Sequence, residues 1–321
     1  MSLPAAIQTV LLQDGDVCVR VLSIGCAVQS WTVAGVPVLL GYANTDDYRS
    51  NPFSMSTVIG RVVNRISNAS FELQGQQYEL SANAGIHHIH GGSEGLGWRV
   101  WHTEVLDQKS VRFSCLSEHL DQGYPGQVQF SVELRLEGHT LSYDMRALPD
   151  RLTPINMAQH HYFNLMGEGD IREHELRIAA SRYTPTDAQA FPLGTIEPVE
   201  HTIYDFRQAR TIADADPQGL AHDASLIVEQ EDRSEPIAEV NAANGLRLRM
   251  WSDQPCVQLY TSGTLTAHGT PGEGAAHQRF AALCLEAQNF PDAMAHPNFA
   301  SILHSPDNPY HQQLAIEIAP Q

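Results

Sequence analysis

Alternation of apolar and polar residues is the strongest pattern along the chain, and it predicts β-strands. Over residues 128–137 apolar and polar side chains alternate strictly, a Gly-His pair follows at 138–139, and the alternation resumes over residues 141–145. A period of two on both sides of a turn predicts an antiparallel hairpin with one buried and one solvated face. Residues 71–80 repeat this scheme around Gly75. Further strands are predicted over residues 16–33, 98–106, 110–116, 245–251 and 257–261.

The sequence contains no convincing amphipathic helix of ten or more residues. Many short strands separated by turn signals predict an all-β protein, built as a sandwich of antiparallel sheets. Four long segments interrupt the strand pattern, and loops of such length in a compact domain are often functional. They span residues 41–57, 85–97, 214–224 and 264–278. Since no internal repeat, low-complexity tract or linker divides the chain, we expect one domain over residues 1–321.

Composition and charge exclude several classes of partner and substrate. Of the 321 residues, 42% are apolar and 17% are charged, which is typical of a globular protein. The chain has 19 basic and 37 acidic residues and a net charge of −18. A negative field of this size argues against nucleic acids, anionic membrane surfaces and polyphosphorylated substrates as partners. A neutral small molecule would be indifferent to it.

The cysteines and the N-terminal residues indicate a cytoplasmic protein. The cysteines are odd in number, scattered and without CxxC spacing, which favours reduced thiols in a cytosol. They are Cys18, Cys26, Cys115, Cys256 and Cys284. The first residues show neither the basic nor the apolar region of a signal peptide, and no stretch approaches eighteen consecutive apolar residues. We therefore expect no membrane association.

One carboxylate near the C-terminal end is a candidate catalytic group. Glu286 stands between an apolar run, residues 280–285, and a proline-containing turn. The run has the length of a strand and the turn should end it, so Glu286 is predicted at the rim of a buried strand, close to solvent. Partial burial raises the pKa of a carboxyl group and makes it a useful proton acceptor near neutral pH. A solitary glutamate at a strand end is more often only solvated, so the choice depends on the neighbouring motifs.

Four sequence segments favour a catalytic role for Glu286 over a merely solvated position. They are IGRVVNRI at 59–66, IHHIHGG at 86–92, HHYFNLMG at 160–167 and LEAQNFPDA at 285–293. In this order and at these separations they resemble the aldose 1-epimerases, the galactose mutarotase family, over nearly the whole chain. The resemblance implies a galactose mutarotase-like supersandwich of large antiparallel sheets. It also implies an enzyme that interconverts the α and β anomers of a free monosaccharide such as galactose or glucose. No cofactor and no metal are implied, and the protein is expected to be a monomer or homodimer.

The same resemblance implies the catalytic residues. Glu286 matches the general base at the anomeric hydroxyl, and His160 matches the general acid that protonates the ring oxygen. His161 occupies a place where the family usually has serine. Neighbours in a strand point to opposite faces, so one of the two histidines can enter a pocket. The resemblance favours His160. A histidine and a tuned glutamate both titrate near neutral pH, which suits this reaction.

Five more residues are implied as sugar ligands: Asn64, Arg65, His90, Asp223 and Gln258. The chain departs from the family around Asp223, where the family has a segment like DHNF and this chain has DASL. Aligning the neighbouring histidine instead would put Ala221 at the acidic position. We prefer Asp223, because the apolar residues after it then fall on a strand.

Alternative functions come from other classes. A silent carbohydrate-binding protein or a phosphosugar 1-epimerase could use the same scaffold, the latter with a basic cluster for phosphate. A cupin-type metal enzyme would use the HxHxxxE spacing of His88, His90 and Glu94. Trp98 and Trp101 are expected in the core rather than on a sugar.

Overall fold

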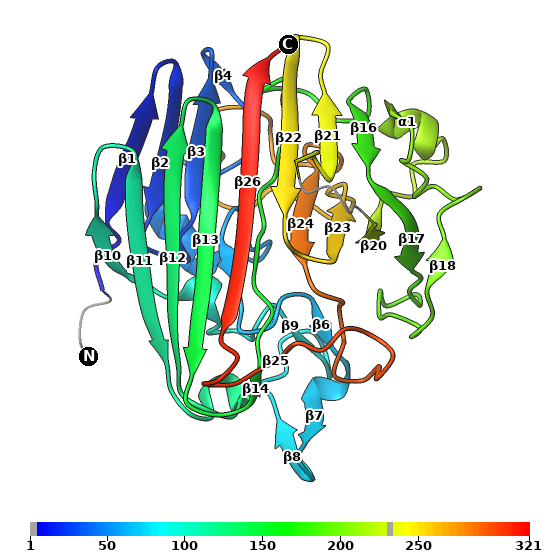
Figure 1. Cartoon of the computed structure of the whole chain (residues 1–321). Helices are drawn as coiled ribbons and strands as arrows, with labels where there is room; N and C mark the ends of the chain where they lie inside the picture. Colours follow the sequence, from blue (N-terminus) through cyan, green and yellow to red (C-terminus); the bar gives the residue numbers. More distant parts are fainter. Residues whose placement is uncertain (1–4, 230–233) are drawn as a thin grey trace.

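The largest sheet of the computed structural model is antiparallel and has nine strands (Figure 1). The structure describes residues 5–229 and 234–321. In spatial order the nine strands are β10 (His102–Val105), β11 (Ser110–Ser117), β12 (Val128–Glu137), β13 (Thr140–Pro149), β26 (Tyr310–Pro320), β22 (Leu246–Ser252), β21 (Ala238–Asn241), β16 (Glu175–Ile178) and β19 (Arg210–Thr211).

Two further antiparallel sheets lie behind the nine-stranded one (Figure 1). The four-stranded sheet contains β1 (Thr9–Asp14), β2 (Val17–Leu22), β3 (Val28–Val33) and β4 (Val36–Pro37). The five-stranded sheet contains, in spatial order, β18 (Glu197–Pro198), β17 (Ala180–Thr184), β20 (Asp223–Val228), β23 (Cys256–Tyr260) and β24 (Cys284–Gln288). The predicted all-β sandwich is therefore confirmed.

Short strand pairs and helical turns complete the described part of the chain. The pairs are β5 (Val58–Ile59) with β15 (Ala158–Gln159), β6 (Arg65–Ile66) with β9 (His88–Ile89), β7 (Ser70–Leu73) with β8 (Gln76–Glu79), and β14 (Thr153–Pro154) with β25 (Leu303–His304). The helical turns are α1 (Ile212–Ala215) and the 3₁₀ turns η1 (Thr45–Ser50), η2 (Ser67–Ala69), η3 (Leu96–Trp98) and η4 (Asp121–Gly123). No helix of the described residues is long and apolar enough to cross a membrane.

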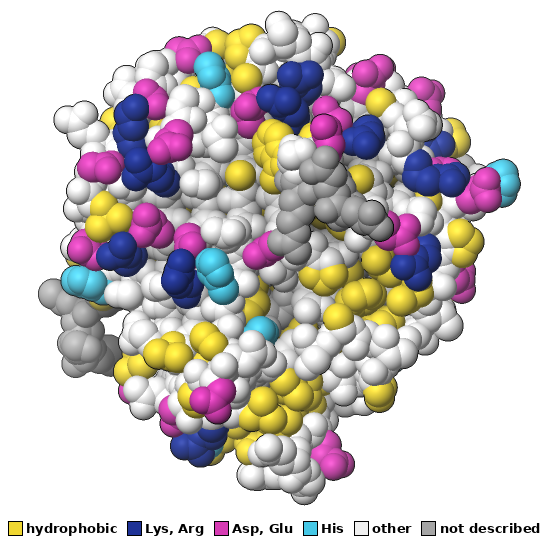
Figure 2. Space-filling view, in the orientation of Figure 1, with side chains coloured by type: hydrophobic (Ala, Val, Ile, Leu, Met, Phe, Trp, Pro, Cys, Tyr) yellow, Lys and Arg dark blue, Asp and Glu magenta, His cyan; other side chains and the backbone are white. Residues whose placement is uncertain are grey.

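Hydrophobic alternation produces the sheet faces that the sequence predicts. In β12 the apolar side chains from Val128 to Leu136 are buried, and they pair across the ladder with those of β13. The opposite face of the nine-stranded sheet carries interspersed basic and acidic side chains (Figure 2). Ion pairs such as Arg112–Glu133 at 2.9 Å and Arg249–Glu317 at 2.5 Å link neighbouring strands there. One wet face and one buried face are normal for antiparallel sheets.

The main hydrophobic core fills the space between the layers. The nine-stranded sheet contributes Val132 and Ile316, the four-stranded sheet contributes Trp31, and the five-stranded sheet contributes Val257 and Leu285. All five are fully buried. Because one continuous core joins the three sheets, the five-stranded sheet is held at a fixed position relative to the others.

The structure corrects the predicted place of Glu286. The apolar run over residues 280–285 is not one strand, since Phe280 has a positive φ of 62° and β24 begins at Cys284. Glu286 is consequently the middle residue of β24, with 2% of its surface exposed. It is therefore buried rather than placed at a strand rim.

Candidate active site

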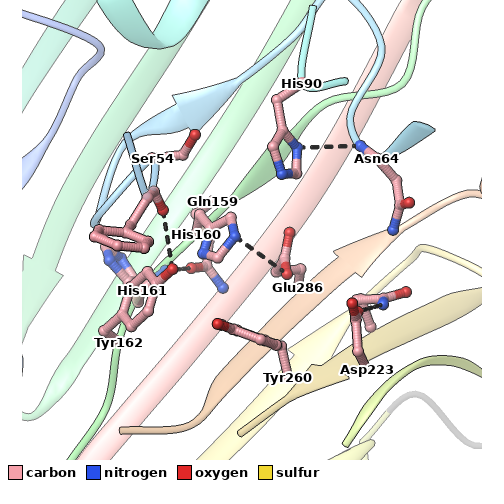
Figure 3. Close-up of polar contacts among 12 residues, drawn as sticks. Ser54, Asn64, His90, Gln159, His160, His161, Tyr162, Asp223, Tyr260 and Glu286 are labelled. Atoms are coloured by element: carbon pink, nitrogen blue, oxygen red, sulfur yellow. Dashed lines mark hydrogen bonds and ion pairs between the residues drawn. The ribbon is translucent and has the colours of Figure 1, made fainter. Parts of the chain in front are cut away.

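A pocket of about 460 Å³ opens beside β24. It brings together all seven residues that the sequence analysis singled out. They are Asn64, Arg65, His90, His160, Asp223, Gln258 and Glu286. The four long segments predicted as functional loops each contribute to its wall, through Ser54, His90, Asp223 and Thr264 among others. The polar residues converge from distant parts of the sequence on one concave surface (Figure 3).

Strand register explains why three of these side chains meet. Gln258 in β23 pairs directly with Glu286 in β24 and with Ser225 in β20. Side chains at paired positions project from the same face of a sheet, so Gln258 and Glu286 are neighbours. Asp223 lies two residues before Ser225 and therefore projects from this face as well.

Glu286 and His160 form a close pair at the floor of the pocket. Their Oε1 and Nε2 atoms are 3.6 Å apart (Figure 3), and the side chains are 3% and 7% exposed. Burial raises the pKa of Glu286 well above its ordinary value, and nearby Asp223 raises it further, whereas Arg65 opposes the shift. Burial lowers the pKa of His160 to about 4. The free site thus favours the uncharged forms of both groups.

The two adjacent histidines face opposite ways, as predicted. His160 follows β15 and its ring stacks on Tyr162 with centroids 5.0 Å apart. The His161 ring lies in the core, where its Nε2 atom shares a hydrogen bond of 2.7 Å with the Tyr143 hydroxyl. Burial lowers the pKa of His161 to about 3. His161 is thus a neutral core residue that does not line the pocket.

His90 is held as a hydrogen-bond donor toward the pocket. Its Nδ1 atom accepts a hydrogen bond of 3.2 Å from the backbone N–H of Asn64 (Figure 3). Burial lowers the pKa of His90 well below its ordinary value, and His160 and Arg65 add to that effect. A neutral imidazole that accepts at Nδ1 carries its proton on Nε2. His90 can therefore donate Nε2–H to an uncharged ligand oxygen.

Asp223 joins two other pocket residues. Its Oδ1 atom accepts a hydrogen bond of 2.6 Å from Gln258 Nε2, and its Oδ2 atom lies 3.5 Å from an Arg65 guanidinium nitrogen. Arg65 also donates from its backbone N–H to Asn64 Oδ1 at 2.9 Å. Of the two sequence alignments considered, the structure brings Asp223 into the pocket, whereas Ala221 does not line it.

Comparison with known proteins decides the family. Residues 8–317 match the family described as Aldose 1-epimerase. The chain belongs to the aldose 1-epimerase family. Among its relatives, galactose mutarotase of Rattus norvegicus is 34% identical over 319 residues, which cover 95% of this chain and 92% of that protein. Aldose 1-epimerase of Escherichia coli K12 is 34% identical over 273 residues, which cover 81% of this chain and 78% of that protein.

Solved structures of the family share the fold. An aldose epimerase homologue from C. elegans superimposes with a TM-score of 0.93 at 24% identity, covering 98% of this chain and 99% of that one. Galactose 1-epimerase from Lactobacillus acidophilus gives a TM-score of 0.84 at 21% identity, covering 98% and 99%. The predicted galactose mutarotase-like supersandwich is confirmed.

The aldose 1-epimerase pocket also has aromatic walls that the sequence analysis did not find. Phe53, Trp98, Tyr162 and Tyr260 line it. Trp98 was expected in the core and this prediction is wrong, because Trp98 is only partly buried at the pocket wall. Trp101, in contrast, is a core residue with 2% exposure. Trp98 ends the 3₁₀ turn η3 and the strand predicted over residues 98–106 begins only at His102, so strand alternation does not decide the burial of Trp98.

The HxHxxxE spacing does not form a metal centre in this aldose 1-epimerase fold. Both ring nitrogens of His88 are engaged, Nδ1 with the Ser81 carbonyl at 2.6 Å and Nε2 with the Tyr124 hydroxyl at 2.7 Å. Glu94 is exposed, and it is absent from the pocket wall that His90 lines. Over residues 5–229 and 234–321, no three His, Cys, Asp or Glu side chains are grouped as metal ligands.

Proposed function

We propose that this protein is an aldose 1-epimerase that interconverts the α and β anomers of a free aldose such as galactose or glucose. The observation that carries the proposal is the Glu286–His160 pair, 3.6 Å apart and buried at the floor of a polar pocket. The anomeric hydroxyl and the ring oxygen of a pyranose are bonded to the same carbon. An acid and a base that serve these two oxygens must therefore lie close together.

The reaction follows from these two groups. Glu286 accepts the proton of the C1 hydroxyl, whose oxygen then forms the carbonyl of the open chain. The bond between C1 and the ring oxygen breaks, and the ring oxygen takes a proton from His160. Rotation about the C1–C2 bond presents the other carbonyl face, and the two transfers run in reverse. Each cycle leaves Glu286 ionised and His160 protonated, so no net proton is consumed.

The Glu286–His160 pair can catalyse the reaction when the two groups together hold one proton. With one proton on the pair, Glu286 is protonated and His160 neutral, or the proton moves to His160 and leaves a carboxylate–imidazolium pair. Burial favours the uncharged arrangement in the free site, which agrees with the raised pKa of Glu286 and the lowered pKa of His160. The two titrations therefore belong to the pair.

We expect a bell-shaped pH profile of kcat/KM. Near and below the His160 pKa of about 4 both groups carry protons, so no base remains and activity falls. Above the raised pKa of Glu286 the pair has lost its last proton, so no acid remains and activity falls again. Polarimetry across pH measures both limbs.

A His160 variant tests which group produces the alkaline limb of the pH profile. In His160→Gln, Glu286 is the group left to titrate, and it must be ionised to act. Residual activity should therefore rise with pH to a plateau. An alkaline limb that persisted in His160→Gln would show that another residue supplies the proton.

Asp223 and Arg65 are proposed to hold sugar hydroxyls together with Asn64, His90 and Gln258. Asp223 is 38% exposed at its side chain and already accepts from Gln258, so its free lone pairs can accept from a hydroxyl. We expect Asp223→Asn to raise KM and to lower kcat, because a charge-assisted hydrogen bond of about 1.5–3 kcal/mol is weakened. Initial rates over a range of sugar concentrations measure both constants. Unchanged kinetics would remove Asp223 from the site but leave the acid–base pair intact.

The pocket favours an unphosphorylated sugar. Among the described lining residues, Arg65 is the one with a permanent positive charge, and Asp223 already lies against it. A phosphate dianion would lack the basic cluster that usually holds it. Polarimetry on freshly dissolved α-anomers of free hexoses and pentoses, without added cofactor or metal, tests the function. Sugar binding without any acceleration would instead identify a silent carbohydrate-binding protein.

We also propose a cytoplasmic, single-domain protein that needs no cofactor and acts as a monomer or homodimer. All five cysteines are free thiols in the structure, which agrees with a reducing compartment. The family match from residue 8 to 317 supports one domain. Light scattering coupled to gel filtration measures the oligomeric state.

A further inference from the structure

Two buried glutamine side chains cap the free edge of the strand that carries Glu286. β24 is the last strand of the five-stranded sheet and pairs with β23 on one side. On the other side, the carbonyls of Leu285 and Ala287 flank Glu286. Gln159 Nε2 donates to the Leu285 carbonyl at 2.8 Å, and Gln312 Nε2 donates to the Ala287 carbonyl at 2.9 Å.

The opposite end of each amide is tied to the segment that carries His160. Gln159 Oε1 accepts from the backbone N–H of His161 at 2.8 Å. Gln312 Oε1 accepts from the Tyr310 hydroxyl, whose oxygen in turn accepts from the backbone N–H of Met157 at 3.1 Å. Residues 157–161 and 285–287 are thereby closed into a ring through two side-chain amides and one hydroxyl.

This hydrogen-bonded ring links the His160 segment to β24, although the two do not pair as neighbouring strands of a sheet. β15, which precedes His160, pairs with β5 and not with β24. Gln159 and Gln312 are fully buried and line no part of the pocket, so neither can touch a bound sugar. In a buried setting each amide must find partners, and here both use a donor and an acceptor. Buried hydrogen-bond networks of this kind restrict the movement of the groups that they join.

We propose that Gln159 and Gln312 are positioning residues that set the separation of the Glu286 carboxylate and the His160 imidazole. The inference rests on the proposed acid–base function of that pair. Gln159 acts directly on both sides, since its one amide binds the residue after His160 and the residue before Glu286. Displacement of a catalytic group by about 1 Å can cost on the order of a hundredfold in rate.

The first experiment replaces Gln159 by leucine, which keeps the approximate volume but removes both hydrogen bonds. We expect kcat to fall about 10- to 100-fold, with KM and sugar affinity changed less than about threefold, because the sugar contacts remain. The matched control is Gln29→Leu. Gln29 donates to the backbone carbonyls of Tyr42 and Ala43 at 2.9 and 3.2 Å and does not line the pocket. The control variant should keep the wild-type kcat.

A double-mutant cycle separates positioning from general loss of structure. In a Glu286→Gln background the base is already absent, so the spacing of the pair no longer matters. Gln159→Leu should then cost far less than in the wild-type background, which is the non-additivity of residues that act as a unit. An equal fold loss in both backgrounds would overturn the proposal.

A third measurement does not depend on turnover. Imidazole resonances followed by NMR across pH give the pKa of His160 in the wild type and in Gln159→Leu. We expect the pKa to move and the resonance to broaden in the variant, with no such change in Gln29→Leu. An unchanged His160 titration would overturn the positioning role, even if the protein had no epimerase activity. Absence of activity in the wild type together with an altered titration would instead overturn the proposed function alone.

Discussion

Replacing Glu286 by glutamine is expected to slow anomer interconversion by roughly two to four orders of magnitude, the usual cost of losing a general base. The amide preserves the size of the side chain but cannot accept the C1 hydroxyl proton at neutral pH. The fold should survive, because an uncharged amide suits a position that is 2% exposed. Sugar affinity should change little, since the other polar groups of the pocket remain. Polarimetric rates and calorimetric sugar binding measure the two effects separately.

A matched control makes the same chemical change elsewhere. Glu133→Gln removes a carboxylate from the outer face of the nine-stranded sheet, where Glu133 pairs with Arg112 at 2.9 Å. Exposed ion pairs contribute about 0–1 kcal/mol to stability, so this variant should retain full activity. Near-normal turnover in Glu286→Gln would contradict the mechanism.

Replacing His160 by glutamine is expected to lower kcat by a similar roughly two to four orders of magnitude, because the ring oxygen loses its proton donor. Open-chain aldehyde cannot form rapidly if the departing ring oxygen keeps a negative charge. KM should rise less than kcat falls, since His90 and the other sugar ligands remain. Polarimetric initial rates at saturating sugar measure kcat.

The adjacent histidine provides the control. His161→Gln removes the core hydrogen bond to Tyr143, and the loss should cost about 1–3 kcal/mol of stability. Its melting temperature should therefore fall, while turnover per folded molecule stays within a few-fold of the wild type. If His161→Gln lost activity to the same extent as His160→Gln, the assignment of the acid to His160 would be wrong.

Strand alternation predicted many of the strands, because it reports burial directly, but the long strand β26 (Tyr310–Pro320) and the shorter strands β1, β16 and β21 were not predicted. The hairpin around Gly138-His139 is β12 and β13, and the predicted strand over residues 245–251 is β22 (Leu246–Ser252). Periodicity failed where the chain is apolar without being extended. Phe280 has a left-handed backbone conformation, so the apolar residues before Cys284 do not belong to β24.

Motifs placed Asn64, Arg65, His90, His160 and Glu286, since each lies in one of the four family-like segments. Asp223 and Gln258 lie outside those segments and were placed only by the family resemblance. Most of the aromatic wall and the glutamine ring had no such signal, although Tyr162 lies within the HHYFNLMG segment. Phe53 is contributed by the loop that contains η1, and Gln312 by a strand over 150 residues away from Gln159 in the sequence. Their proximity depends on how the sheets pack, which no local pattern encodes.

The position of β26 has a consequence for biosynthesis. This strand, Tyr310–Pro320, follows all the others in the sequence, yet it lies between β13 and β22 in the middle of the nine-stranded sheet. While a ribosome is still translating, the two halves of that sheet have no neighbour to join them, and Ala287 lacks its glutamine cap. Pairing between segments so distant in sequence is slow, because chain entropy must be lost before the contacts form. The nascent chain should therefore remain protease-sensitive and inactive until residues 310–320 have left the exit tunnel.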